Sequence, residues 1–225
     1  MITLNTALEQ LSALANPARA QKQAKQNKIE RPYLGVTNPE IDVLYKQWRA
    51  DVDGADRLTL AAGLWDSNIF EARIAAAKLL TQARISPDAA VWDTLISWID
   101  DLDGWAIGEQ VMGALARRFM AVPDRFEILE NWAEVDSPWH RAATLMITQP
   151  LTKLNNPKQA EQAQRDAILG MAGQLVGDHN TFVQRALADW LRTLGKHAPN
   201  QTQAFLDEFS AQMNPLTLAE ANKHL

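Results

Sequence analysis

The sequence predicts an all-α fold, and more narrowly an α-solenoid of HEAT-like helical repeats, an α-α superhelix with a concave face. Helix-start signals are frequent, strand signals are nearly absent, and one helical template recurs along the chain. We expect residues 1–225 to form a single domain of this kind, large enough to bury a sizeable core. Roughly ten to twelve helices are expected, because no hairpin-type turn is flanked by alternating hydrophobic residues.

Prolines mark many of the expected helix starts. Asn or Ser at the N-cap accepts a backbone N–H that has no partner inside the helix, and a proline in the first turn lacks that N–H altogether. Thr217 and Glu220 in "TLAE" have the spacing of a further capping box. Six of the ten prolines follow Asn or Ser: Pro17, Pro39, Pro87, Pro138, Pro157 and Pro215.

Three segments share one template, in which an Asp is followed by an Arg and then by small and apolar residues. They are 65–80, 135–147 and 177–191, and their arginines are Arg73, Arg141 and Arg185. The template recurs after 70 and 42 residues, with the helix expected after Trp105 midway in the longer gap. A period near 40 residues of paired helices is typical of HEAT-like repeats, which stack into a superhelix. The alternative is an irregular helical bundle.

Composition excludes several kinds of chemistry. The chain has no cysteine, so disulfides, cysteine-based zinc fingers and thiol catalysis are absent. The four histidines, His140, His179, His197 and His224, have no metal-ligand spacing, and neither a glycine-rich phosphate loop nor a G-x-S-x-G elbow occurs. The first residues lack a signal-peptide pattern or a membrane anchor, which indicates a cytoplasmic protein.

The net charge of −5 means that any polyanion must be held by a local basic patch. Residues 18–31 contain such a patch, with a base at every third position and one acid, Glu30. Each step of three falls about 60° short of a helical turn, so the stripe winds slowly around the helix. It is either a phosphate-backbone contact or a solvated helix face. Its bases are Arg19, Lys22, Lys25, Lys28 and Arg31.

A second candidate lies in "DLDGWAIGEQV", residues 101–111. Trp105 and Glu109 are four residues apart, so on a helix the indole and the carboxylate share one face. Arg141, Trp139 and Trp190 lie in repeat segments, each tryptophan close to an arginine. Tryptophans in a solenoid are more often core residues than ligand contacts, so both interpretations remain open.

At these residues the chain resembles the AlkD-type DNA alkylation repair proteins, HEAT-like-repeat DNA glycosylases. The resemblance rests on an ordered series of segments spread over nearly the whole chain. The segments are "YLGVTNPEI" (33–41), "LWDSNIFEARIAAAKLL" (64–80), Trp105 to Glu109, "WHRAATLM" (139–146) and "FVQRALADWLRTLGKHAP" (182–199).

The resemblance implies excision of cationic N3- or N7-alkylated purines from double-stranded DNA without base flipping, by a monomer that needs no metal or organic cofactor. It implies Glu109 as the catalytic carboxylate, where the family usually has aspartate, and Trp105 as the sugar-contacting ring. Arg141 falls where the family has an arginine that contacts the backbone phosphate near the lesion. Further DNA contacts are expected from the basic stripe, at Arg19, Lys22 and Lys25, and from the repeat segments, at Arg185 and Trp190. The family's second tryptophan aligns with Asp189, one residue before Trp190. The alternatives are a catalytically silent module that binds damaged or branched nucleic acid, and a protein-interaction solenoid.

Overall fold

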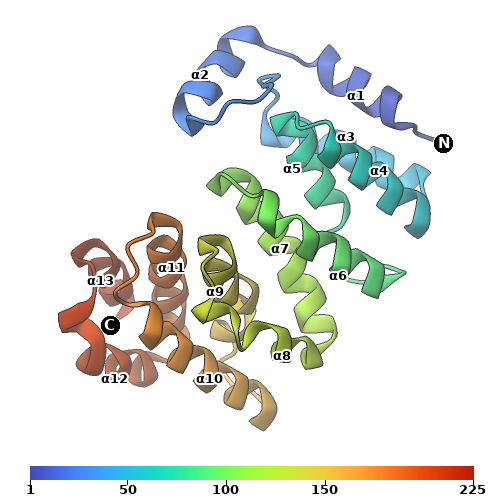
Figure 1. The fold of residues 1–225 in the computed structure, drawn as a ribbon. Helices are drawn as coiled ribbons and strands as arrows, with labels where there is room; N and C mark the ends of the chain where they lie inside the picture. The colour runs from blue at the N-terminus through green and yellow to red at the C-terminus, as the bar shows by residue number, and fades with distance from the viewer. The chain divides into compact units, whose positions relative to one another are not determined.

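The computed structural model describes residues 1–225 and is built from thirteen α-helices and short 3-10 turns, with no strand (Figure 1). The all-α prediction is confirmed, and the fold is of the α-solenoid class. Two compact units make up the chain, Met1–Arg118 and Phe119–Leu225. The expectation of a single domain stays a prediction.

Unit 1, Met1–Arg118, is formed by the first seven helices, the last of which crosses the unit boundary. Within it α5 packs against α3 and α4, and α1 packs against α3, α4 and α5. Its core contains large buried side chains, among them Leu11, Ile41 and Trp48. The helices are α1 (Leu4–Ala13), α2 (Pro17–Asn27), α3 (Asn38–Asp51), α4 (Gly54–Asp66), α5 (Phe70–Leu79), α6 (Asp88–Ser97) and α7 (Trp105–Ala121).

Unit 2, Phe119–Leu225, is organised around one long helix, α11, which packs against α9, α10, α12 and α13. Leu187, Leu191 and Leu194 of α11 are fully buried. The helices of this unit are α8 (Phe126–Leu129), α9 (Pro138–Thr152), α10 (Gln159–Leu175), α11 (Thr181–His197), α12 (Pro199–Phe209) and α13 (Pro215–Ala221).

The six Asn/Ser–Pro signals lie at or near the starts of six of the thirteen helices. Pro17, Pro138 and Pro215 are the first residues of α2, α9 and α13, each preceded by an Asn or Ser whose side chain accepts a first-turn N–H. Pro39 is the second residue of α3, Pro87 directly precedes α6, and Pro157 lies two residues before α10. These local signals act through adjacent residues, so they survive the packing of the helices.

The capping box expected at Thr217 and Glu220 is wrong. Both residues lie inside α13, which is capped instead by Asn214, whose Oδ1 accepts the N–H of Leu216 at 2.9 Å. Glu220 pairs with Arg192 of α11 at 2.9 Å. The cap moved because Asn214–Pro215 is itself a complete helix-start signal three residues earlier.

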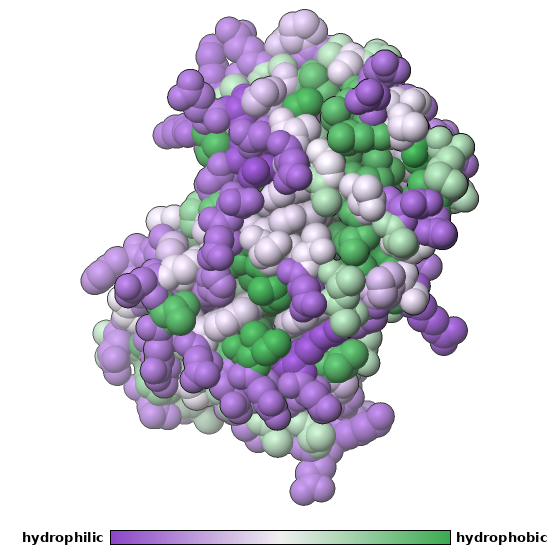
Figure 2. All heavy atoms as spheres, turned by 45° about the vertical axis from the view of Figure 1, so that its right-hand side comes forward, coloured by the Kyte–Doolittle hydropathy of each residue, from purple (hydrophilic) through white to green (hydrophobic).

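On the face drawn in Figure 2, hydrophobic patches lie among predominantly hydrophilic side chains. Large apolar residues with more than a third of their surface exposed occur in both units, for example Val43 and Ile128. None of the helices combines the length and apolar character needed to cross a bilayer.

Candidate nucleic-acid interface

The Trp105–Glu109 pair lies in the first turns of α7, as the sequence predicted for a helix. The Trp105 side chain is half-buried and the Glu109 side chain is exposed. A spacing of four residues places both on one side of the helix. A half-buried flat ring therefore neighbours an exposed carboxylate.

The segment that leads into α7 is held at two aspartates. Trp65 Nε1 of α4 donates to Asp101 Oδ2 at 3.1 Å, and Arg73 Nη1 of α5 donates to the Asp101 carbonyl at 3.3 Å. Arg31 forms an ion pair with Asp103, and its side chain is only 3% exposed. These contacts fix the backbone immediately before Trp105.

An aromatic and cationic stack supports the same segment. The rings of Trp65 and Trp98 are parallel within 2°, with centroids 4.2 Å apart, and the Arg73 guanidinium lies 4.5 Å from the Trp65 ring. Burial lowers the pKa of Arg73, the nearby charge of Arg31 lowers it further, and Asp101 opposes them. Arg73 nevertheless remains a cation at neutral pH, because an arginine pKa lies far above 7.

The resemblance segment "YLGV" is anchored by a fully buried carboxylate. Glu71 accepts the N–H groups of Leu34 at 2.9 Å, Gly35 at 2.7 Å and Val36 at 3.3 Å. Gly35 has a φ of 77°, and a Cβ there would lie 2.3 Å from the Asn16 carbonyl oxygen. Only glycine fits this approach of the segment to the start of α2.

The basic stripe predicted for residues 18–31 keeps its three lysines exposed, while both of its arginines form ion pairs. Arg19 is half-buried and pairs with Glu40 of α3 at 3.4 Å, and Arg31 is buried against Asp103. The helix ends at Asn27, with Lys28 in a left-handed backbone conformation. Lys22 and Lys25 remain as exposed lysines on α2, a helix with no buried residue. The two arginines at the ends of the stripe form ion pairs with carboxylates that are distant in the sequence. The spacing of charges along the chain does not reveal such partners.

Arg141 of unit 2 lines an open depression with Asp178, His179 and Asn180. Its Nε donates to Asp178 Oδ2 at 2.6 Å, and its Nη1 donates to the carbonyls of Val135 and Asp136. The guanidinium is thus held at one edge, with 19% of the side chain exposed.

The other two unit 2 candidates differ sharply in exposure. Arg185 is exposed in the second turn of α11. Trp190 is 1% exposed, and its Nε1 donates to Thr148 Oγ1 of α9 at 3.2 Å. A buried ring cannot contact DNA, so the expected contact between Trp190 and DNA is not supported by this position of the side chain. Its ring faces the α9–α11 contact and packs the core.

Two residues of this region escaped the sequence interpretation. Asp178 and Arg185 belong to the same template segment, but the Asp178 carboxylate binds Arg141 of the preceding segment. Gln184 is buried and donates to three backbone carbonyls. The available signal was the repeated Asp–Arg template itself, read across neighbouring repeats. No group of three or more His, Asp or Glu side chains is placed to hold a metal ion.

Three solved structures share this fold. The first, described as a predicted DNA alkylation repair enzyme from Enterococcus faecalis, has 17% identity and a TM-score of 0.79 over 94% of this chain and 96% of its own. AlkD2 from Streptococcus mutans has 17% identity and a TM-score of 0.64, over 92% and 99%. The smu.31 protein of Streptococcus mutans UA159 has 16% identity and a TM-score of 0.64, over 96% and 99%. No curated protein sequence matches the chain.

The fold is that of a helical protein of the α-solenoid class, in which unit 1 has an aromatic–carboxylate pair and unit 2 has an anchored arginine. The family model described as "DNA alkylation repair enzyme" matches residues 7–225. The chain therefore belongs to the DNA alkylation repair enzyme family, and the resemblance found in the sequence is confirmed.

Proposed function

We propose that this protein is a monomeric DNA glycosylase that releases cationic N3- and N7-alkylated purines from double-stranded DNA without base flipping. The observation that carries the proposal is the Trp105–Glu109 pair on α7, an exposed carboxylate one turn from a half-buried ring. Membership of a DNA alkylation repair family supplies the substrate class.

The chemistry requires little from the protein. An alkylated purine carries a positive charge, so the C1′–N bond breaks with its electron pair moving to the purine, which leaves neutral. The deoxyribose is left as an oxocarbenium ion, which the Glu109 carboxylate stabilises electrostatically. Glu109 then accepts a proton from water as the water oxygen bonds to C1′. The products are the free alkylpurine and an abasic site, and no metal or organic cofactor takes part.

Binding is assigned to an aromatic ring and to basic side chains. The Trp105 ring packs on the deoxyribose, where its π face favours the developing positive charge. Arg141 contacts a backbone phosphate in unit 2. Lys22 and Lys25 add phosphate contacts in unit 1, each strengthening binding through counterion release. Arg19 and Arg185 are assigned lesser contacts, Arg19 because Glu40 already neutralises part of its charge.

The test is release of 7-methylguanine and 3-methyladenine from methylated duplex DNA under single-turnover conditions. Wild type should release base, and Glu109→Gln should lose release while retaining DNA affinity. Glu109→Asp moves the carboxylate by about an ångström, a displacement that can change rates by about 10²-fold. Release by Glu109→Gln at the wild-type rate would remove Glu109 from the mechanism.

A second candidate function is a catalytically silent module that binds damaged or branched nucleic acid. The burial of Trp190 favours it, because a second sugar-contacting ring is missing from the surface at that position. This module would bind DNA with a steep salt dependence but release no base. Lys22→Gln should lower the salt slope of binding by about 0.9. Lys46→Gln, an equal charge change at an exposed lysine of α3, is the matched control.

A further inference from the structure

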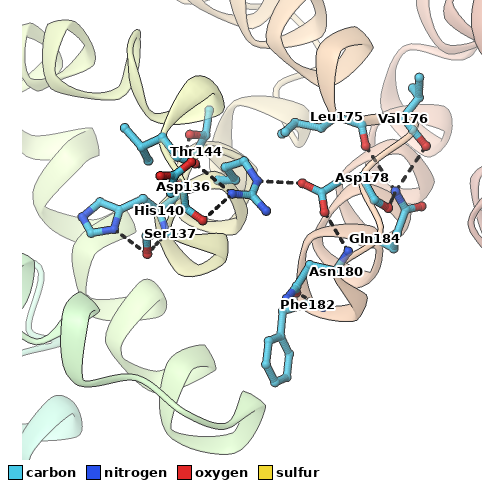
Figure 3. A network of polar contacts seen from close by, with 12 residues as sticks. Asp136, Ser137, His140, Thr144, Leu175, Val176, Asp178, Asn180, Phe182 and Gln184 are labelled. Atoms are coloured by element: carbon cyan, nitrogen blue, oxygen red, sulfur yellow. Dashed lines mark hydrogen bonds and ion pairs between the residues drawn. The ribbon is translucent and has the colours of Figure 1, made fainter.

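We propose that Asp178 and Gln184 are positioning residues that orient the Arg141 guanidinium toward a backbone phosphate. The proposal rests on the proposed function, in which Arg141 contacts DNA. All of its contacts lie within unit 2, and Figure 3 draws the network around Asp178.

The guanidinium of Arg141 is anchored on one side only. Nε donates to Asp178 Oδ2 at 2.6 Å, and Nη1 donates to the carbonyls of Val135 at 2.8 Å and Asp136 at 2.7 Å. None of these contacts uses Nη2. Because the guanidinium is planar, three bonds at Nε and Nη1 fix its plane and direct Nη2 in one direction.

Asp178 is itself held in place. Its Oδ1 accepts the N–H of Asn180 at 2.7 Å, while Oδ2 accepts from Arg141, and the side chain is 11% exposed. Both carboxylate oxygens therefore have partners, and the carboxylate cannot rotate without breaking one of these bonds. Asn180 also caps α11 through the N–H of Phe182, which ties this turn to the helix.

The backbone around Asp178 is held by hydrogen bonds from the buried side chain of Gln184. Its Nε2 donates to the carbonyls of Leu175 at 3.2 Å, Val176 at 3.2 Å and Asp178 at 2.9 Å. Its Oε1 accepts from the Thr217 hydroxyl of α13 at 2.8 Å. A single buried amide thus connects the end of α10, the turn with Asp178, and α13.

The side chain of an anchored arginine is already ordered before DNA binds. Binding a phosphate therefore costs less conformational entropy than it would with a mobile arginine. The arrangement has an electrostatic disadvantage, because a carboxylate beside the phosphate site opposes a polyanion. Asp178 favours DNA binding only if its orientation of the Arg141 guanidinium contributes more than the repulsion between its carboxylate and the phosphate costs. The two effects have opposite signs and can be separated by experiment.

The experiment measures affinity of the full-length protein for duplex DNA at several salt concentrations. Asp178→Asn keeps an acceptor but loses the charge, and is expected to weaken binding by about threefold to tenfold. The matched control is Glu220→Gln, which removes the same charge from another arginine-paired carboxylate, in α13 and 2.9 Å from Arg192. It should bind as tightly as wild type or more tightly. If Asp178→Asn also binds as tightly or more tightly, positioning is refuted.

Arg141→Ala separates this proposal from the proposed function. It should weaken binding by about tenfold to a hundredfold, and adding Asp178→Asn should then have no further effect. Wild-type affinity in Arg141→Ala would refute the phosphate contact, and the positioning proposal with it. A weakened Arg141→Ala with an unaffected Asp178→Asn would refute positioning alone.

A second readout needs no DNA. The Nε–H proton of Arg141 should exchange slowly with water in the wild-type NMR spectrum and quickly in Asp178→Asn and Gln184→Ala. A stability measurement by denaturant accompanies Gln184→Ala, since that variant removes buried hydrogen bonds. Equal exchange rates in wild type and folded Asp178→Asn would overturn the proposal.

Discussion

Trp65 Nε1 donates a hydrogen bond to Asp101 Oδ2 at 3.1 Å, joining α4 to the segment that precedes α7. The two residues are 36 positions apart in the sequence. Since Trp105 begins α7 only four residues after Asp101, this bond helps to place both the ring and the carboxylate of the proposed catalytic pair. The position of the buried Trp65 ring in unit 1 therefore affects the positions of Trp105 and Glu109 on α7.

Trp65→Phe should therefore affect stability and base release together. The lost hydrogen bond and ring volume are expected to cost about 2 kcal/mol, lowering the melting temperature by about 4–8 °C. Base release at a temperature where the variant is folded should fall by about tenfold, through displacement of Glu109. Trp98→Phe is the control, because the Trp98 ring stacks on Trp65, and the only hydrogen bond between Trp98 and Asp101 runs through the Trp98 backbone carbonyl, which the substitution keeps. Equal slowing of release by both variants would contradict this role of the hydrogen bond.

Glu71→Gln should destabilise the fold without any change at the surface. The Glu71 carboxylate accepts three backbone N–H groups, and an amide in its place directs an N–H group at one of these donors. The expected loss is about 1–3 kcal/mol in the free energy of unfolding, measured by urea denaturation. Glu109→Gln, the same change at an exposed site, should stay within about 0.5 kcal/mol of wild type. An unaltered urea midpoint for Glu71→Gln would show that the buried carboxylate is not an anchor.

Trp190→Phe should reduce stability and leave base release by the folded protein unchanged. The Trp190 indole is buried and bonded to Thr148, so the variant loses packing and a hydrogen bond, together about 1–3 kcal/mol. Thermal unfolding and single-turnover release measure the two effects separately. Slower release with unchanged stability would instead indicate that the ring reaches the DNA.

Acid should weaken the N-terminal cap of α3, where Glu40 bonds to Thr37, and to a lesser degree the ion pair between Glu40 and Arg19 of α2. The backbone N–H of Thr37 lowers the pKa of Glu40 below its ordinary value of 4.5, helped by the Thr37 hydroxyl and by Arg19. A carboxyl with a depressed folded-state pKa stabilises the fold above its unfolded-state pKa, and this contribution disappears as the pH falls through the folded-state pKa. The stability difference between wild type and Glu40→Gln should thus be full at neutral pH and shrink below about pH 4.5. A difference that is constant between pH 7 and pH 3 would contradict the assignment.

The sequence alone predicted what adjacent residues decide. Asn16–Pro17, Ser137–Pro138 and Asn214–Pro215 mark helix starts because a cap oxygen and a first-turn proline act within one turn. The spacing of Trp105 and Glu109 likewise fixes their shared side on any helix. The helical periods and the repeated template led to the fold class, and the ordered segments led to the family.

Only the tertiary structure decided which partner each polar or aromatic side chain takes. Arg31 is buried against Asp103, Arg141 binds Asp178, and Trp190 faces Thr148 rather than the surface. Each pair joins residues on different helices or turns, and the choice between a solvated and a buried position depends on how those elements pack. Apart from the repeated Asp–Arg template, residue spacing does not indicate these partners, because burial energy and ion-pair geometry arise between segments that are distant in the chain.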